Sequence, residues 1–320
     1  MPSWLLKAAM QGVMSALPAS DRLNYLFQRH VTGSVVLSDE VFERKVAQCS
    51  RHIRSYQTAR DGAGLPSLAL ELGTGWYPVV PVGLALAGVA RVVTVDVSSL
   101  LSPERTRQVL AAHAALLRSG QAEQLLPQIA AERADAVMAA AGDQVSKSAA
   151  ELLEPLGIEV LIGDARASGL PAGSVDLFVS NNTFEHIAPQ VLREIVAEFK
   201  RLAAAGAVMD HFVDMSDHYA HFDGSITEFN YLRYSDRAWR LFNNRLQYQS
   251  RLRIPDYRRI LEEGGFSIVA EDDEQGPADD LARVELAPRF RHYAVEDLLT
   301  LRVWLTAVSP RAAGARTRPA

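Results

Sequence analysis

The sequence is poor in features that mark exported or membrane-spanning proteins. Cys49 is the only cysteine among 320 residues, so no disulfide can form within the chain, and we interpret Cys49 as a buried, inert thiol. No apolar run reaches the roughly 18 residues that a membrane-spanning helix needs, and we recognise no export signal at the N-terminus. Together these absences predict a cytoplasmic protein without a transmembrane segment.

Positive charge is also scarce. Lys and Arg total 33 against 38 Asp and Glu, so the formal net charge is -5. Because no basic stripe stands out along the chain, we do not expect a nucleic-acid partner. Hydrophobic residues make up 48% of the chain and charged residues 22%, which is ordinary for a folded protein. The length suits one large domain or two small ones.

Residues 1–62 are predicted to form an N-terminal helical cap. A loose apolar stripe over residues 4–17 indicates the first helix, and Ser20 and Ser38 are typical N-cap residues for two more. We expect the stripe to pack on the core or to form a homodimer contact. A cluster of chain-breaking residues at 61–66 marks the end of this cap.

Short apolar segments alternate with helical segments in the remainder of the chain. The predicted strands are 68–72, 91–96, 159–162, 175–180, 207–213, 266–270 and 299–308. The predicted helical segments are 80–87, 103–119, 122–154, 189–203 and 257–263. This alternation indicates one α/β domain over residues 63–308 with a parallel sheet covered on both faces. Residues 213–257 interrupt the rhythm and are predicted to form an inserted lid or substrate region, and residues 309–320 a disordered tail.

The loop after the first predicted strand has the composition of a ligand site. Gly73 and Gly75 allow a ligand to approach the backbone, and the helix that follows offers free N–H groups. Asp96 ends the next strand, where a carboxylate can bind both hydroxyls of a ribose. Asp164 ends the third strand and can accept a hydrogen bond from an adenine amino group, with the N–H of Ala165 beside it.

These residues and the loop 180–187 together resemble class I S-adenosylmethionine-dependent methyltransferases, over residues 67–212. The resemblance implies a Rossmann-like sheet of seven strands, mostly parallel with the last antiparallel, and S-adenosylmethionine as methyl donor. It also assigns roles: the methionine moiety lies beside Glu71, Gly73 and Gly75, the ribose is held by Asp96, the adenine by Asp164 and Ala165, and the reacting methyl lies beside Asn181. Thr74, Tyr77 and Val97 complete the predicted cofactor-binding set.

One part of the loop departs from the family pattern. The family's common third glycine is missing, and Trp76, Tyr77 and Pro78 occupy its region. The first turn of the helix must therefore be shaped differently, and Tyr77 is a candidate to cover the cofactor. Pro78 also argues against a dinucleotide-binding loop, which would need glycine at that position.

Polar residues after the fourth and fifth strands are the catalytic candidates, namely His186, Asp214, His218 and His221. One of them is expected to remove a proton from the methyl acceptor, since imidazole titrates near neutral pH. Two alternatives stay open for the patch at 210–223. In one, which we do not favour, a divalent cation is bound by some of Asp214, Asp217, His218, His221 and Asp223. In the other, these residues only cap a helix and satisfy one another.

The sequence thus predicts a methyltransferase that acts on a small-molecule acceptor, with O-methylation of a sugar or secondary metabolite as the expected reaction and no resident metal. Two other functions remain open. A non-catalytic interaction protein could have kept the cofactor fold, or the same fold could support another transfer, such as aminopropyl transfer.

Overall fold

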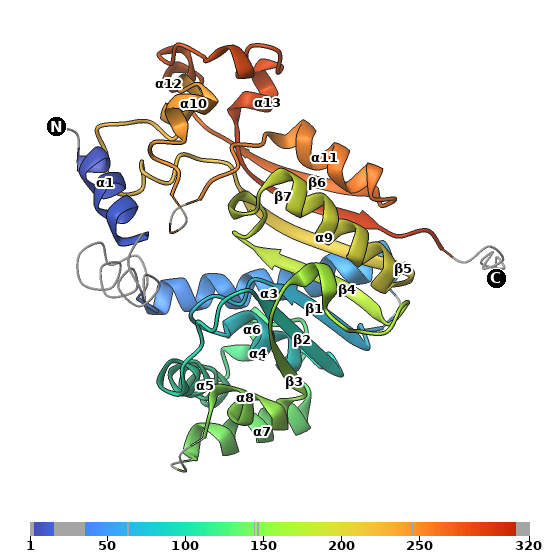
Figure 1. The fold of residues 1–320 in the computed structure, drawn as a ribbon. Coiled ribbons are helices and arrows are strands. Elements are labelled where there is room, and N and C mark those ends of the chain that lie inside the picture. Colours follow the sequence, from blue (N-terminus) through green and yellow to red (C-terminus); the bar gives the residue numbers. More distant parts are fainter. Residues whose placement is uncertain are drawn as a thin grey trace.

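The computed structural model describes residues 3–15, 36–62, 64–143, 145, 147–244, 246 and 248–311 (Figure 1). The helix predicted to start at Ser20 lies outside the described residues, as does most of the tail predicted to be disordered. None of the helices within these ranges is both long and apolar enough to cross a membrane.

Seven strands form one sheet: β1 (Leu68–Leu72), β2 (Arg91–Asp96), β3 (Ile158–Ile162), β4 (Val175–Asn181), β5 (Ala203–Asp214), β6 (Ser267–Gln275) and β7 (Thr300–Val308). Their spatial order is β3-β2-β1-β4-β5-β7-β6. The first five strands pair in parallel, whereas β7 runs antiparallel to both β5 and β6. The predicted Rossmann-like sheet, mostly parallel with an antiparallel last strand, is confirmed.

The helices are α1 (Ser3–Ser15), α3 (Asp39–Ala59), α4 (Val79–Leu86), α5 (Pro103–Arg118), α6 (Ala122–Leu125), α7 (Ala131–Gly142), α8 (Ala149–Leu153), α9 (Pro189–Leu202), α10 (Asp236–Trp239), α11 (Ile254–Glu263), α12 (Ala278–Ala282) and α13 (Val295–Leu299). Short 3₁₀ turns are η2 (Glu154–Leu156), η3 (Ala165–Ala167), η4 (Phe184–His186), η5 (Asn230–Arg233) and η6 (Pro288–Phe290).

The prediction of one continuous helical stretch over residues 122–154 is wrong, because α6, α7 and α8 are separate. Pro127 disfavours helical backbone at Leu126, which is extended with φ -106° and ψ 143°. Farther on, Ser148 starts α8 with a capping box, in which Ser148 and Glu151 bond each other's backbone N–H.

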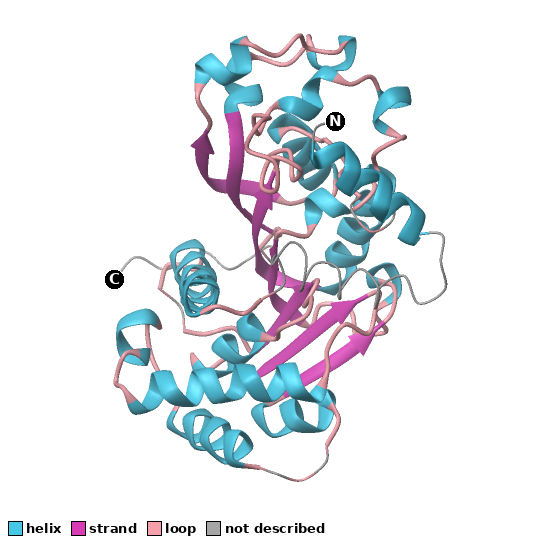
Figure 2. Cartoon of the chain, turned by 90° about the vertical axis from the view of Figure 1, so that its left-hand side faces the viewer, coloured by secondary structure: helices cyan, strands magenta, loops and turns pink. Residues whose placement is uncertain are grey.

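Helices cover both faces of the sheet, and alternate residues of each strand face opposite layers. In β1, Ala69 packs in the cluster that includes α3 to α8, whereas Leu68, Leu70 and Leu72 pack in the cluster that includes α9 and α11. Figure 2 shows this layered arrangement from the side. The buried core therefore fixes the sheet, and it leaves the carboxyl ends of β1 to β5 at one edge for a ligand site.

A third hydrophobic cluster lies outside these two layers. It joins Trp4 of α1 to Tyr231 and Trp239 of the inserted segment and to Phe290, which precedes β7. Figure 1 shows α1, α10 and α12 together at the end of the molecule away from α5, α7 and α8. The backbone N–H of Trp4 also donates a hydrogen bond to Asp223, at 2.9 Å. The first helix is thus tied to the inserted segment, in a cluster that also includes Leu301 of β7.

The other N-terminal helix, α3, packs directly on the sheet layer. Ser38 caps it by accepting a hydrogen bond from the N–H of Val41. Its inner face buries Phe42, Val46 and Cys49. As predicted, Cys49 is buried, and burial raises the pKa of its thiol well above the ordinary value, which keeps it protonated and inert.

Candidate active site

A cavity of about 770 Å³ opens at the carboxyl ends of β1 to β4, a volume typical of small-molecule sites. Nine of the ten predicted cofactor-binding residues line it: Gly73, Thr74, Gly75, Tyr77, Asp96, Val97, Asp164, Ala165 and Asn181. Residues 36 and 37, just before α3, and residues 41 and 45, in its first turns, line one side. The described residues of the inserted segment 213–257 contribute nothing to the lining.

The backbone geometry of the glycine loop disfavours any larger residue at Gly73 and Gly75. Gly73 has φ +82°, and a Cβ there would lie 2.6 Å from Oγ1 of Thr183. Gly75 has φ +68°, a conformation that side chains disfavour, with open space where its Cβ would be. The loop therefore combines a tight turn against Thr183 with free room beside Gly75.

Asp96 is held rigidly at the wall of the cavity. Its two carboxylate oxygens accept hydrogen bonds from the N–H groups of Gly75, at 3.2 Å, and Ser98, at 3.0 Å. Burial raises the pKa of Asp96, whereas these backbone donors lower it. Because each oxygen retains a further acceptor position, the carboxylate can still bind a hydroxyl pair from the cavity.

Glu71, the tenth predicted residue, lies behind the cavity wall. It is 3% exposed and accepts a hydrogen bond from Oγ1 of Thr94, at 2.8 Å. Thr74 in turn bonds the hydroxyl of Thr94, which links Glu71 to the glycine loop. Burial raises the pKa of Glu71 to about 7, and the charge of Lys45 counteracts this rise.

Asp164 is bound by a residue that the sequence analysis missed. The guanidinium of Arg166 donates to both oxygens of Asp164, with Nε at 2.9 Å from each. The backbone N–H of Arg166 also donates to Asp164, at 2.9 Å. These hydrogen bonds hold the pKa of Asp164 at about 2. An adenine amino group would therefore share this carboxylate with Arg166, which also lines the cavity.

Asn181 ends a buried chain of hydrogen bonds that the sequence analysis also missed. Nδ1 of His52, on α3, lies 2.7 Å from Oδ2 of Asp210. A carboxylate only accepts, so this nitrogen carries the proton, and Nε2 of His52 accepts from Nδ2 of Asn181, at 3.1 Å. Thr306 donates to the other oxygen of Asp210, at 2.7 Å. The only sequence feature that could have indicated this chain of hydrogen bonds is the position of His52 on the inner face of a helix.

The four catalytic candidates lie near one another. His186 lines the cavity, and its ring centroid is 5.0 Å from that of His218, which is 5.4 Å from that of His221. Nε2 of His218 lies 4.0 Å from Oδ2 of Asp214. The polar row formed by His186, His218, His221 and Asp214 thus begins at the cavity and leads away from it.

Electrostatics keep two imidazoles of this row neutral at neutral pH. Burial lowers the pKa of His186, and burial, together with repulsion between the protonated forms of the two rings, lowers the pKa of His218 to about 3. The backbone carbonyl of Tyr248 accepts a hydrogen bond from Nδ1–H of His186, at 2.7 Å. That bond leaves Nε2 of His186 unprotonated and able to accept a proton or bind an ion.

Other polar residues of the patch at 210–223 satisfy local bonds. Asp217 accepts from the amide of Asn230, at 3.0 Å, and Asp223 accepts from Trp4. His211 is fully buried and bonds Ser180, at 2.8 Å. The set of metal ligands considered from the sequence is therefore not gathered around one point, and only His218 belongs to a group with metal-binding geometry in the described chain.

Two arginines of the inserted segment are structural. Arg253 is fully buried and donates to the backbone carbonyls of Met215, at 2.8 Å, and Leu298, at 2.9 Å. Arg251 is buried as well and donates to the carbonyl of Tyr234, at 2.6 Å. Both guanidiniums hold the segment together and do not face the cavity.

Residues 141–209 match the family described as methyltransferase domain. The PH0226 protein from Pyrococcus horikoshii is similar with 11% identity and a TM-score of 0.48, over 89% of this chain and 98% of that one. An S-adenosylmethionine-dependent methyltransferase from Methanosarcina mazei is similar with 14% identity and a TM-score of 0.40, over 76% of this chain and 92% of that one. No curated protein sequence matches.

The strand order with its antiparallel β7 is the sheet that the resemblance to class I S-adenosylmethionine-dependent methyltransferases implies, and residues 141–209 match the methyltransferase domain family. The matched segment runs from the end of α7 through β3, β4 and α9 into β5. The matched segment does not include the Gly73–Gly75 loop. The argument that this loop binds a ligand therefore depends on its geometry alone.

Proposed function

We propose that this methyltransferase binds S-adenosylmethionine in the 770 Å³ cavity and methylates a hydroxyl group of a small molecule, such as a sugar or secondary metabolite. One observation carries the proposal: a single cavity has the glycine loop and Asp96 in one part of its wall and Asn181 and His186 in another. We also propose that the protein is cytoplasmic, as its sequence predicts.

The residues of the wall fit the parts of S-adenosylmethionine. The space beside Gly75 accommodates a ligand that a Cβ would displace, and Asp96 offers acceptors for ribose hydroxyls. Ala165 and Asp164 lie at the end of β3, where we assign the adenine. Glu71 acts from behind the wall, through Thr94 and Thr74, and we propose that it supports the loop and does not touch the ligand.

The acceptor end of the cavity is assigned to Asn181 and His186. When bound, S-adenosylmethionine supplies a sulfonium methyl group that an acceptor oxygen can attack in line. Oδ1 of Asn181 is buried with no partner among the described residues, so it can accept a hydrogen bond that orients an acceptor. Nε2 of His186 is our candidate base for the hydroxyl proton, because the bond from Nδ1–H to the carbonyl of Tyr248 leaves its lone pair free and burial keeps the imidazole neutral.

The cover of the cofactor is assigned to the start of α3. Residues 36–45 supply Val36, Leu37, Val41 and Lys45 to the lining, whereas the inserted segment 213–257 supplies Asp214, His218 and His221 of the polar row. We therefore propose that the N-terminal cap shields the cofactor and that the inserted segment bounds the acceptor.

Replacing Asp96 with Ala tests the cofactor assignment. We expect S-adenosylmethionine affinity to fall by roughly 1–3 kcal/mol, the value of charge-assisted hydrogen bonds, which is about 5- to 150-fold in Kd. Isothermal titration calorimetry measures this directly. Asp135→Ala is the matched control, because Asp135 is an exposed carboxylate on α7 that does not line the cavity.

An unchanged Kd in Asp96→Ala would contradict the ribose assignment, and absence of binding by the wild type at millimolar ligand would contradict the enzyme function itself. Release of S-adenosylhomocysteine during turnover is the expected product signature. Release of 5′-methylthioadenosine in place of S-adenosylhomocysteine, from S-adenosylmethionine or its decarboxylated form, would instead mean that the propyl side chain of the donor is transferred, as in aminopropyl transfer.

A further inference from the structure

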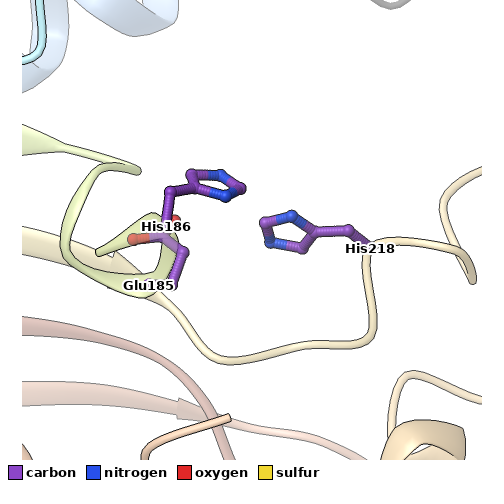
Figure 3. Close-up of side chains that lie close together, drawn as sticks. All are labelled: Glu185, His186 and His218. Atoms are coloured by element: carbon purple, nitrogen blue, oxygen red, sulfur yellow. The ribbon is translucent and has the colours of Figure 1, made fainter. Parts of the chain in front are cut away.

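The loops after β4 and β5 bring three ligating side chains together at the acceptor end of the cavity. We propose that Glu185, His186 and His218 bind one divalent first-row transition-metal ion. Each residue offers a ligand atom, and these atoms lie within 4.8 Å of one another. Figure 3 shows the two imidazole rings edge to edge, with Glu185 close to His186.

Two of these residues have buried polar atoms without a partner. Glu185 is 2% exposed, and one of its oxygens, Oε2, has no hydrogen-bond partner among the described residues. Nε2 of His218 is buried without a partner there as well. Buried polar atoms are nearly always hydrogen-bonded, so two such atoms on residues of one group with metal-binding spacing call for a ligand or an ion.

The third ligand is already oriented for coordination. The carbonyl of Tyr248 fixes Nδ1 of His186 as the protonated nitrogen, so the lone pair on Nε2 is free for an ion. A metal-binding histidine commonly donates its other N–H to a backbone carbonyl in this way. The carboxylate of Glu185 is likewise positioned, because its Oε1 accepts from the N–H of Asp214, at 3.3 Å.

The donor set selects the class of ion. Two imidazoles and one carboxylate are typical of catalytic zinc and of non-haem Fe²⁺, whereas Mg²⁺ and Ca²⁺ prefer oxygen ligands alone. Bonds of about 2.0–2.2 Å require ligand atoms roughly 3.5 Å apart, and ligand atoms within 4.8 Å of one another reach this spacing by closing at most about 1.3 Å. With three protein ligands, further coordination positions stay open, and His186 places them beside the cavity.

An ion in this place would polarise an acceptor oxygen and lower its pKa. This effect on the acceptor rests on the proposed function and deepens it. With the ion bound, the Nε2 lone pair of His186 would coordinate the metal and would no longer be available as a base. The binding of the ion does not depend on the proposed function. Chelation should abolish turnover of the metal-loaded enzyme, whereas catalysis by His186 alone would be insensitive to a chelator.

Metal binding itself is the deciding measurement. Untagged full-length protein is stripped with a chelator and titrated with Zn²⁺ by calorimetry and with Co²⁺ by visible absorption, and Mg²⁺ is titrated for comparison. We expect one equivalent of Zn²⁺ or Co²⁺ per chain. Glu185→Gln and His218→Gln should each weaken binding more than about 100-fold, since loss of a second-shell partner alone costs 10- to 100-fold.

His292→Gln is the matched control, because His292 is exposed and stacks only on Tyr293 in the described structure. Circular dichroism and thermal unfolding establish that each variant is folded, and two ligand variants guard against failure of one. The proposal is overturned if the stripped wild type binds neither Zn²⁺ nor Co²⁺. It is also overturned if folded Glu185→Gln and His218→Gln variants bind as tightly as the control. Metal binding without any methyl transfer would keep this site and contradict only the proposed function.

Discussion

At the scale of single residues, Glu71 differs from the other carboxylates of the site because it is buried away from the cavity. Asp96 and Asp164 reach the cavity and are held by N–H donors. Glu71 is enclosed, with hydroxyl donors and the half-buried Lys45 as its compensation. A carboxylate in such surroundings resists ionisation, and its pKa rises to about 7.

This shift predicts a pH dependence of stability. The unfolded chain releases the Glu71 proton near pH 4.5, whereas the folded chain keeps it up to about pH 7. Between these values the folded state binds more protons, so the free energy of unfolding should fall as pH rises, by about 3 kcal/mol in total from this group. Urea unfolding of the wild type and of Glu71→Gln at pH 5 and pH 8 measures the difference.

Glu71→Gln keeps an acceptor for Thr94 and removes the titration, so we expect the variant to lose less stability than the wild type between pH 5 and pH 8. Equal losses in both proteins would mean that Glu71 ionises normally. Glu123→Gln, an exposed carboxylate on α6, serves as the control and should follow the wild type.

Some residues of the site could be predicted from the sequence and others could not, because some directly follow a strand whereas others come from a distant helix. Gly73, Asp96 and Asn181 follow strands directly, and the carboxyl ends of parallel strands meet at one edge whatever the details of packing. His52 reaches the site from a helix 129 residues away from Asn181. No local pattern encodes such a contact, because it depends on how α3 is oriented against the sheet.

At the scale of elements, α3 is anchored to the sheet by a polar pair as well as by apolar packing. His52 and Asp210 both have fully buried side chains, and their bond joins α3 to β5. Through Asn181 the same bond reaches the end of β4 and the cavity. Helix α3, whose first turns line one side of the cavity, is therefore coupled to the strand end that carries Asn181 on the cavity wall.

Breaking this pair should be costly. His52→Leu leaves the carboxylate of Asp210 buried with Thr306 as its remaining side-chain donor, and we expect a loss of about 3–5 kcal/mol in the free energy of unfolding. Denaturant unfolding measures the loss, and His292→Leu at an exposed position should change stability by less than about 0.5 kcal/mol.

A double-mutant cycle shows whether the cost comes from the pair. In His52→Leu combined with Asp210→Asn the buried charge is gone, so the double variant should lose less than the sum of the single losses. Strict additivity would indicate that His52 contributes only its packing, and α3 would then be held by its apolar face alone.

At the scale of the whole molecule, the sequence predicted the sheet well and the inserted region poorly, for a physical reason. Buried parallel strands are short apolar runs whose order along the chain sets their place in the fold. The segment 213–257 has no such period, since its order depends on buried arginines bonded to distant carbonyls, as for Arg253 with Leu298. Its packing against α1 is likewise a contact of high sequence separation.

Trp4 tests whether α1 and the inserted segment form one cooperative unit separate from the sheet. Trp4 is 3% exposed, and its ring centroid lies 5.5 Å from that of Tyr219 and 5.1 Å from that of Phe242. Removing a buried Trp side chain costs about 3–5 kcal/mol, and in Trp4→Ala this loss should fall on the third cluster. Hydrogen exchange should therefore accelerate in residues 215–242 and 278–299, while β1 to β5 keep their protection.

Leu6→Ala is the control on the same helix, because Leu6 is 57% exposed, and it should leave exchange unchanged in both regions. A uniform acceleration in Trp4→Ala that includes β1 and β4 would mean that the chain opens as a single unit. Confinement of the change to the third cluster would mean that the region around the polar row can open while the lining of the cavity keeps its protection. That lining comes from the carboxyl ends of the strands, the loops and helix that follow them, and residues 36–45.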